Sequence, residues 1–296
     1  GYCESCLDYY REENGGSDTR EELAQFISRQ ANVDCRAEEW NTSARSYWKI
    51  ITDSSINCER GEIDVEVVTP SVEDYLLRGT EGMEVLNRVM DAMNEYGVRV
   101  NSSVGLHVHW GAEGRYTPKV ERLEAHTFAN LIKFYAFYEG IFDSMLPRSR
   151  RGRNPSYLAS VKSHYNSSTA RELCRKVDRI MERTAGRELE SVIHDLQELC
   201  SHDRYCKLNI QSYFKHGTVE FRHHSGTCDG KKALAWIELT QNILIYCSKN
   251  STRISEDHVP SFTKLMILTK SRKELKEHYA GRREHFKEQY KSLTAY

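Results

Sequence analysis

The chain has 296 residues, enough to bury a sizeable core as one large domain or two small ones. Hydrophobic residues make up 39% and charged residues 29%, the composition of a globular protein rather than a disordered one. Lysine plus arginine (42) nearly balances aspartate plus glutamate (43), so no net field directs the chain to nucleic acid or to a membrane surface. No apolar stretch approaches a membrane span, and the N-terminal residues lack the pattern of a signal peptide, so we expect a soluble, cytoplasmic protein.

Nine cysteines are scattered along the chain from Cys3 to Cys247. A secreted disulfide framework is usually shorter and has an even number of cysteines at regular spacing. We therefore expect mostly reduced thiols in a reducing compartment. Four glycosylation sequons favour a secreted protein instead, but such tripeptides are frequent by chance.

The N-terminal third is predicted to combine one helix with a pair of strands. Thr19 and Glu22 form a capping box ahead of an amphipathic run over residues 21–31. Two runs rich in β-branched residues follow, over 48–53 and 62–69, and a turn separates them. We predict that these two runs form an antiparallel pair.

The rest of the chain alternates long helical patterns with short strand patterns. Because strands and helices are partly segregated and the strands look locally paired, we predict an α+β fold with a largely antiparallel sheet. The predicted elements are a helix over 81–96 that stops at Gly97, a strand over 98–110, helices over 123–145 and 169–200, the second with a candidate break at Ala185 and Gly186, strands over 207–214 and 218–223, and helices over 232–247 and 271–291.

Three of the predicted strands carry polar residues at every second position, so that these side chains share one face of their strand. Each set has an ordinary explanation: a solvated outer face, a pair of surface histidines, or a cross-strand ladder of ion pairs. The three sets are Glu62, Asp64 and Glu66; His107 and His109; and Glu220, Arg222 and His224.

The three sets gain meaning if their strands belong to one sheet whose apolar backs face the core. Their polar faces would then converge on one surface. Carboxylates and imidazoles bind divalent cations, and the planar guanidinium of arginine matches phosphate. Such a surface suits a complex of metal and nucleotide, in which the metal neutralises charge that develops during phosphoryl transfer.

Several segments resemble the amidoligase family, which belongs to the superfamily of glutamine synthetase and glutamate–cysteine ligase. The resemblance extends from the N-terminus to about Trp236, and its most specific segment is G-T-V-E-F-R-H-H-S-G-T at 217–227. The supporting segments are W-K-I-I-T-D-S-S-I at 48–56, V-E-V-V-T-P at 65–70, G-L-H-V-H at 105–109, Arg204 with Tyr205, and Asn209.

The resemblance implies a glutamine synthetase-like fold, in which a curved, largely antiparallel sheet forms a funnel for ATP and Mg2+ or Mn2+. The γ-phosphate would pass to a substrate carboxylate, and an amine would displace phosphate from the resulting acyl phosphate. Small molecules, peptides or proteins would supply the carboxylate and the amine. Residues 1–250 would form the catalytic domain, with 251–296 as a helical extension packed on it. The oligomeric state stays open.

The resemblance also assigns roles to individual residues. It implies that Glu66, Glu220 and Arg222 are catalytic. An arginine-bearing loop of the family matches residues 147–153, although a solvated loop has the same composition. The implied metal ligands are Glu4, Glu66, His107 and Glu220; the nucleotide and phosphate contacts are His109, Arg222 and Arg150 or Arg151; and the substrate contacts are Arg204, Asn209 and Asp53.

One position departs from the family pattern, which opens with two glutamates one residue apart. Here Glu4 is followed by Cys6, and a thiol is a poor ligand for magnesium. The departure keeps open a catalytically impaired relative that still binds nucleotide. The superfamily also includes guanidino kinases, so a kinase for guanidino or carboxyl groups on the same scaffold is a further alternative. The Cys3-x-x-Cys6 pair lacks the further ligands of a zinc site and the βαβ setting of a redox motif.

Overall fold

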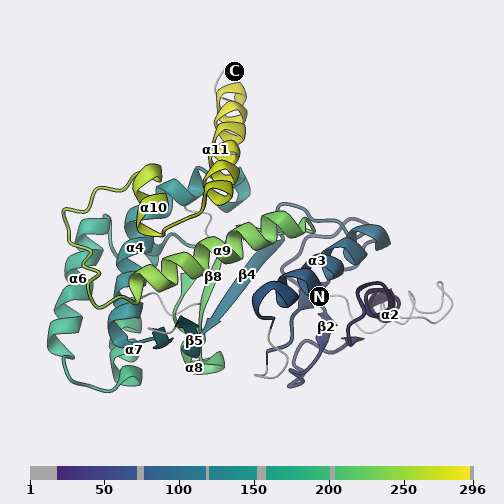
Figure 1. Ribbon diagram of the computed structural model, residues 1–296, viewed down its shortest axis with the longest axis horizontal. Helices are drawn as coiled ribbons and strands as arrows, with labels where there is room; N and C mark the ends of the chain where they lie inside the picture. Colours follow the sequence, from purple (N-terminus) through teal and green to yellow (C-terminus); the bar gives the residue numbers. More distant parts are fainter. Residues whose placement is uncertain (1–18, 72–76, 118–119, 152–157, 201–203, 294–296) are drawn as a thin grey trace. The chain divides into compact units, whose positions relative to one another are not determined.

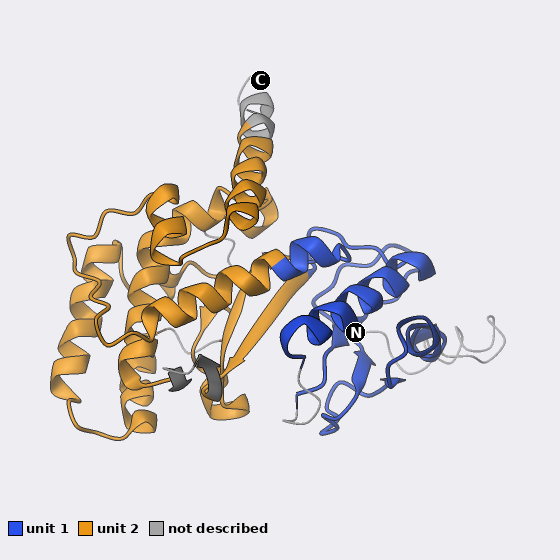
Figure 2. Cartoon of the chain, viewed as in Figure 1, with its two compact units in different colours: residues 1–104, 226–234 blue, residues 105–225, 235–296 orange. Residues whose placement is uncertain are grey.

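The computed structural model describes residues 19–71, 77–117, 120–151, 158–200 and 204–293 (Figure 1). The chain forms two compact units, coloured separately in Figure 2. The first unit comprises residues 1–104 and 226–234, and the second comprises 105–225 and 235–296. None of the described helices is both long enough and apolar enough to cross a membrane.

The first unit contains a small mixed sheet with two helices. Its helices are α2 (Thr19–Ala31) and α3 (Gly79–Tyr96), and its strands are β1 (Cys35–Ala37), β2 (Trp48–Ile51) and β3 (Glu66–Val68). The strand order is β1-β2-β3. Strand β1 runs parallel to β2 and β3 runs antiparallel to it, so the predicted antiparallel pair is confirmed.

Strand β3 is shorter than predicted, because β2 offers it few partners. The ladder ends where Ile51 pairs with Glu66, and two residues later Asp53 turns the chain by accepting hydrogen bonds from the amide and hydroxyl of Ser55. Residues 62–65 precede the strand and have no regular structure. The prediction that Glu62 and Asp64 share a strand face with Glu66 is therefore wrong.

Two glycines end helices where the sequence predicts it. Gly97 follows α3 with φ of 97°, and its amide donates to the last turn of the helix. Gly186 has φ of 79° and separates α6 (Ala170–Arg183) from α7 (Leu189–Gln197), which confirms the break. Glycine adopts this left-handed conformation without the steric cost that a Cβ atom brings.

The second unit is built on an antiparallel sheet with the order β4-β8-β7. Its strands are β4 (Gly105–Gly111), β7 (Leu208–Asn209) and β8 (Thr218–Ser225). Helices α4 (Ala125–Asp143) and α9 (Gly230–Cys247) pack on one face, which we call the core face. Tyr135 of α4 lies 6.0 Å from Phe221, measured between ring centroids, and Trp110 donates a hydrogen bond to Thr240 of α9.

The strands do not form the single sheet that the sequence predicts. In the described residues, β3 pairs with β2 and β4 pairs with β8, and the strands belong to two three-stranded sheets and a two-stranded one. One reason is that β3 has only three residues and is followed closely by Pro70, which has no amide to donate. Four of the five described strand pairs are antiparallel, so the α+β fold with largely antiparallel pairing is confirmed.

Strand β7 is also shorter than the predicted strand over 207–214. The side chain of Asn209 accepts a hydrogen bond from the amide of Gln211 and turns the chain into a short helix. The elements that the sequence patterns did not predict are α8 (Ser212–His216), β1, β5 (Glu113–Thr117), β6 (Val120–Arg122), η2 (Arg148–Arg150), α5 (Val161–His164) and α10 (Phe262–Leu268).

The last helix, α11 (Lys273–Leu293), packs on the C-terminal end of α4. Arg282 donates from Nε to the carbonyl of Met145 at 2.9 Å, and Arg283 donates to the hydroxyl of Ser144 at 3.0 Å. The buried ring of Phe286 lies 5.2 Å from the guanidinium carbons of both Arg151 and Arg282. Cations at this end satisfy carbonyl groups that the helix itself leaves unpaired.

Replacing Phe286 with alanine should lower the free energy of unfolding by about 3 kcal/mol, because the ring is buried and two guanidinium groups pack on it. Urea denaturation followed by circular dichroism measures the change. The neighbouring Lys287→Ala variant, whose side chain is exposed, is the control and should lose no more than about 0.5 kcal/mol. Equal stabilities of the two variants would show that α11 is not anchored through this ring.

Candidate functional site

A β-bulge in β8 shapes the sheet of the second unit. Leu106 of β4 pairs with His224 of β8, whereas Val108 pairs with Phe221. The single residue between them on β4 therefore faces two residues, 222 and 223, on β8. An extra residue of this kind interrupts the simple alternation of side chains between the two faces and bends the strand.

A buried carboxylate, Glu220, lies at the centre of the polar face of this sheet. Its Oε1 accepts from Arg222 Nη1 at 2.8 Å and lies 3.4 Å from His107 Nδ1 and 3.5 Å from His109 Nε2. Its Oε2 accepts from Asn209 Nδ2 at 2.7 Å. We call these five residues the Glu220 cluster. The structure thus brings together five residues that the sequence assigned to one site.

The electrostatics of the cluster keep Glu220 ionised. Burial raises the pKa of this carboxyl, but the hydrogen bond with His109 and the charge of Arg222 outweigh burial and hold the pKa well below its usual range. Burial together with the charge of Arg222 lowers the pKa of His107. At pH 7 the cluster therefore contains a carboxylate beside a neutral His107 imidazole.

Two hydroxyl groups fix the orientation of His109. Its Nδ1 lies 2.9 Å from Thr218 Oγ1 and 3.2 Å from Ser212 Oγ, which leaves Nε2 turned toward Glu220. The ring of His216 packs edge-on against it. Sequence reasoning missed Thr218 and Ser212. The available signal was that Thr218 lies two residues before Glu220, on the same face of β8.

The two arginines predicted for the phosphate loop take different places. Arg150 is 7% exposed and donates to the main-chain oxygens of Arg222 and His223, next to the Glu220 cluster. Arg151 donates instead to the carbonyl of Leu146 and packs on Phe286. The interpretation of this segment as a solvated loop is therefore wrong at Arg150.

The ring of Tyr205 is close both to the cluster and to the predicted substrate residue Arg204. The guanidinium of Arg222 is 5.8 Å from the centre of its ring, and that of the exposed Arg204 is 5.4 Å from it. Cations packed on an aromatic ring are held by its quadrupole. Arg204 thus reaches the neighbourhood of Arg222 through Tyr205.

The prediction that His224 shares the polar face with Glu220 and Arg222 is wrong. The bulge moves His224 to the core face, where it is fully buried and its ring lies 5.3 Å from that of Trp236. Its Nδ1 hydrogen-bonds to the carbonyl of Ser225. A one-residue insertion reverses the face of every residue beyond it, and the sequence pattern carries no sign of that insertion.

Three other predicted site residues are not part of the second unit. Glu66 on β3 and Asp53 after β2 belong to the first unit. Glu4 lies outside the described residues, as do Cys3 and Cys6. The roles that the resemblance assigns to these residues stay predictions.

A second polar cluster lies on the core face, directly behind the site. The fully buried Lys207 donates to Glu139 Oε1 at 2.7 Å and to Asp143 Oδ1 at 2.8 Å. The same Asp143 oxygen lies 2.8 Å from His223 Nε2, and the other nitrogen of that ring lies 3.0 Å from the hydroxyl of Tyr135. We call this set, completed by Lys162, which binds Glu139 at 2.8 Å, the Lys207 network.

The Lys207 network supports the candidate site through the main chain. The carbonyl of Lys207 accepts from the amide of Arg222, and the next two residues form β7, which carries Asn209. Sequence reasoning missed this network. Its signals were a histidine at 223 on the apolar face of a strand, and two acids, Glu139 and Asp143, one helical turn apart on a buried helix.

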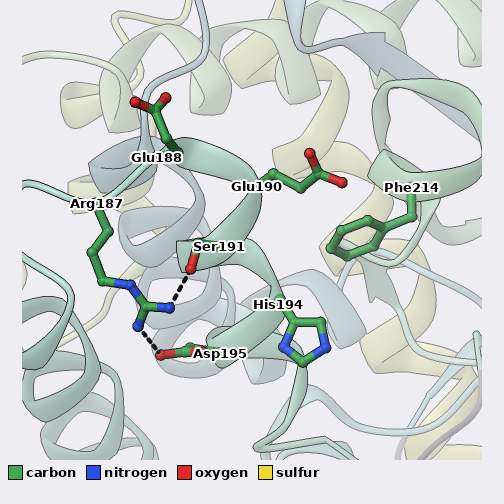
Figure 3. Close-up of a pocket in the computed structure, with 7 residues that line it drawn as sticks. All are labelled: Arg187, Glu188, Glu190, Ser191, His194, Asp195 and Phe214. Carbon is green, nitrogen blue, oxygen red and sulfur yellow. Dashed lines mark hydrogen bonds and ion pairs between the residues drawn. The ribbon is translucent and has the colours of Figure 1, made fainter.

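A surface pocket lies elsewhere in the second unit, with a volume of about 370 Å³. Figure 3 shows that Arg187 reaches both Ser191 and Asp195, and that Phe214 comes from a different element. The pocket is lined by Arg187, Glu188, Glu190, Ser191, His194, Asp195 and Phe214, and none of these residues was predicted for the site.

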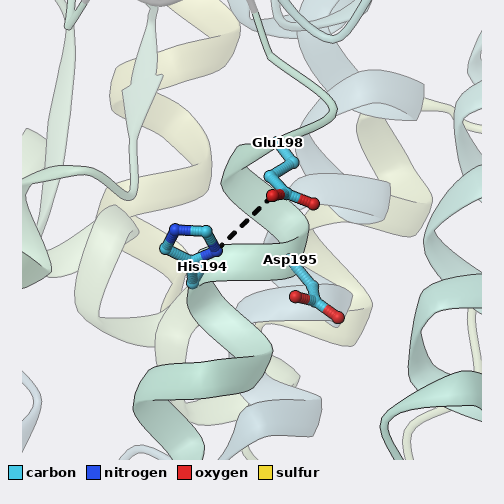
Figure 4. Close-up of side chains that lie close together, drawn as sticks. All are labelled: His194, Asp195 and Glu198. Atoms are coloured by element: carbon cyan, nitrogen blue, oxygen red, sulfur yellow. Dashed lines mark ion pairs between the residues drawn. The ribbon is translucent and has the colours of Figure 1, made fainter.

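Part of this pocket offers ligand types for a metal ion, as His194, Asp195 and Glu198 lie close together on and just after α7 (Figure 4). The carboxylate of Asp195 is, however, already paired with Arg183 and Arg187. His194 and Glu198 are 62% exposed and 3.8 Å apart. Paired and solvated groups of this kind are common on helix surfaces, so we assign no function to them.

Comparison with known protein families gives a match that covers both the Glu220 cluster and the surface pocket. A family model described as "Putative amidoligase enzyme" matches residues 15–244, which is more than half of the chain. The chain belongs to the amidoligase family. The matched residues include the whole β4-β8-β7 sheet and the turn η2. No curated protein and no solved structure matches the chain.

The Glu220 cluster of this amidoligase family member fits a complex of cation and nucleotide better than a bare cation. Glu220 and the two histidines are donors that Mn2+ accepts readily and Mg2+ accepts in part. Arg150 and Arg222 bring two positive charges against the one negative charge of Glu220. A divalent cation with a triphosphate is an anion overall, so it suits a site with excess positive charge. In addition, Nε of Arg222 is buried without a partner among the described residues and could donate to a phosphate oxygen.

Replacing Lys207 with methionine should lower the free energy of unfolding by about 3–5 kcal/mol, because Glu139 and Asp143 would stay buried without their main counter-charge. Urea denaturation at pH 7 measures the loss. The control, Lys162→Met, removes the more exposed partner of Glu139 and should cost about 1 kcal/mol. If Lys207→Met were as stable as the control, the network would not hold the fold.

The stability of the protein should fall as the pH is lowered from 7 to 5. Burial lowers the pKa of His223 to about 4 and that of His224 to about 3, whereas the value in an unfolded chain is about 6.5. Because the folded pKa is the lower one, each histidine contributes stability that is complete above pH ~6.5 and is lost as the pH falls toward the folded value. The loss by pH 5 is about 2 kcal/mol per histidine.

Urea denaturation at several pH values measures this slope. His224→Gln should flatten it by about 2 kcal/mol between pH 7 and 5, whereas His194→Gln, which replaces an exposed histidine, should follow the wild-type slope. Identical slopes in all three proteins would contradict the assignment.

Proposed function

We propose that this chain is an ATP-dependent carboxylate–amine ligase that forms an amide or peptide bond through an acyl phosphate. The observation that carries the proposal is the Glu220 cluster, in which Arg222 Nη1 lies 2.8 Å from a buried carboxylate that two histidines also approach. Membership of the amidoligase family supports ligase chemistry. The buried Nε of Arg222, which has no partner among the described residues, supports a ligand with phosphate groups.

The proposal gives each residue of the cluster a task. Glu220 and His107 hold a divalent cation, Mg2+ or Mn2+, and His109 orients the nucleotide. The cation, when bound, neutralises charge on the phosphate oxygens. Arg222 has unused donors in its planar fork and contacts the phosphoryl group that is transferred. Asn209 holds Glu220 in place, because its side-chain amide donates a hydrogen bond to that carboxylate.

The finer parts of the proposal go beyond the cluster. Glu4 and Glu66 keep their proposed roles as metal ligands, and Arg204 and Asp53 keep theirs on the substrate side. The β4-β8-β7 sheet would belong to a glutamine synthetase-like catalytic fold. Within it, Tyr205 would hold Arg204 close to the residue that binds phosphate.

The proposed reaction has two steps. In the first, an oxygen of the substrate carboxylate attacks the γ-phosphorus of ATP, and ADP leaves. In the second, an amine attacks the activated carbonyl carbon, loses a proton, and phosphate leaves with the oxygen that came from the carboxylate. Positioning and electrostatic stabilisation supply most of the catalysis in phosphoryl transfer, which is what a fixed cluster of charged groups provides.

The transfer of oxygen gives a decisive experiment. The chain is incubated with ATP, Mg2+, an amine pool and a pool of acids labelled with 18O in the carboxylate, and the released phosphate is analysed by mass spectrometry. Labelled phosphate together with an amide product supports the proposal. A stable phosphorylated acid or guanidine would indicate a kinase instead, and nucleotide binding without turnover across the pools would indicate the impaired relative.

Glu220→Gln and Arg222→Ala should each reduce ATP turnover by about 100- to 1,000-fold. The first removes the charge that holds the cation, and the second removes the positive charge at the transferred phosphoryl group. Steady-state release of ADP measures the loss, and far-ultraviolet circular dichroism checks the fold. Arg187→Ala, in the surface pocket, is the matched control and should turn over ATP at the wild-type rate. Normal turnover in either cluster variant would remove the basis of the site assignment.

A further inference from the structure

Arg150 is bonded to the main chain of the bulge. Its Nη2 donates to the carbonyl of Arg222 at 2.6 Å, and its Nε donates more weakly to the carbonyl of His223 at 3.4 Å. These are the two residues that oppose a single residue of β4. Because a bulge interrupts the ladder, its buried carbonyl groups need other donors. One guanidinium supplies both.

The first residue of β4 leaves the space that this arrangement requires. A Cβ atom on Gly105 would lie 2.8 Å from Nη2 of Arg150 and 3.0 Å from Nε2 of His107. Both distances are shorter than normal contacts, so a side chain there would displace one of these two groups. The absence of a side chain at 105 thus allows Arg150 and His107 to pack side by side.

Arg150 is held by hydrogen bonds to the main chain. Among the described residues, no carboxylate forms an ion pair with it. Burial and the charge of Arg222 lower its pKa to about 10. Its Nη2 and Nε both donate to main-chain oxygens, and only 7% of the residue is exposed.

We propose that Arg150 is a positioning residue that locks the β8 bulge and acts on a bound phosphate only through Arg222. Locking the bulge sets the direction in which the side chain of Arg222 leaves the strand and keeps Nη1 on Glu220. The proposal replaces the direct phosphate contact that the family resemblance implied for Arg150. It rests on the proposed function, because it takes nucleotide as the ligand of the cluster.

A double-mutant cycle separates a positioning role from a direct contact. The affinity of the full chain for the magnesium complex of adenylyl imidodiphosphate is measured by calorimetry for wild type, Arg150→Met, Arg222→Ala and the double variant. We expect the single variants to bind about 10-fold and about 100-fold more weakly. If Arg150 acts only through Arg222, the double variant binds no more weakly than Arg222→Ala alone. Multiplied effects, about 1,000-fold, would overturn the proposal.

Arg148→Met is the matched control, because Arg148 lies in the same short turn but is exposed. It should bind the nucleotide as wild type does. Arg150→Lys provides a second variant in case Arg150→Met does not fold. Arg150 reaches the two carbonyls from two different nitrogens, Nε and Nη2, whereas the donors of lysine all lie on one nitrogen, so weaker binding is again expected. Wild-type affinity in a folded Arg150→Lys would overturn the proposal.

Hydrogen exchange tests, in the absence of nucleotide, whether Arg150 restrains the β8 bulge. The amide of Arg222, one of the two bulge residues, donates to the carbonyl of Lys207 on the β7 side of the strand. In Arg150→Met, peptides that cover residues 218–225 should exchange faster than in Arg148→Met, whereas equal exchange would overturn the proposal. This measurement also separates the two hypotheses: if wild type fails to bind nucleotide but the bulge still loosens, the proposed function fails and the positioning role of Arg150 stands.

Discussion

A carboxylate taken out of water must be compensated by positive charge and hydrogen bonds, and Glu220 imposes this requirement on the whole sheet of the second unit. Its compensating groups come from three strands, so each strand must keep its register. A slip of one residue would turn these polar side chains into the core and leave the charge unpaired. The bulge is where that register changes, and for this reason the contacts made there by Arg150 bear on the position of every group in the cluster.

Strand β8 separates two charged layers that have opposite tasks. On the polar face, Arg222 is paired with Glu220 through Nη1 but keeps a buried Nε without a partner among the described residues, which leaves an attraction for anions. On the core face, the Lys207 network matches two carboxylates with two lysines, which leaves no net charge to bury. The layers meet in the main chain, where the carbonyl of Lys207 accepts from the amide of Arg222. A neutral, fully bonded layer is stiff, and stiffness is what a site that works by preorganised charge requires.

Strand periodicity predicts most of the candidate site, because the alternation of side chains depends only on local geometry. The sequence alone predicts His107, His109, Glu220 and Arg222 on one face, and the order of the motifs connects them to a family. It failed at His224 and at the single sheet, since neither a bulge nor the pairing partner of a three-residue strand changes the local pattern. The Lys207 network was missed for a different reason. Its members are distant in sequence, and charged residues on a helix are read as solvated unless their burial is known.

One contact connects the part of the chain that matches the family model to the helix at its C-terminal end. The match ends at residue 244, whereas α11 begins at Lys273. Through Phe286, this later helix packs on Arg151, the neighbour of the residue that locks the bulge. Phe286 packs on the side chain of Arg151, and the carbonyls of β8 accept from the side chain of Arg150. The turn that carries these two arginines therefore has little freedom to rearrange. A segment outside the matched region thus restrains an arginine inside it, next to the residue that contacts the bulge.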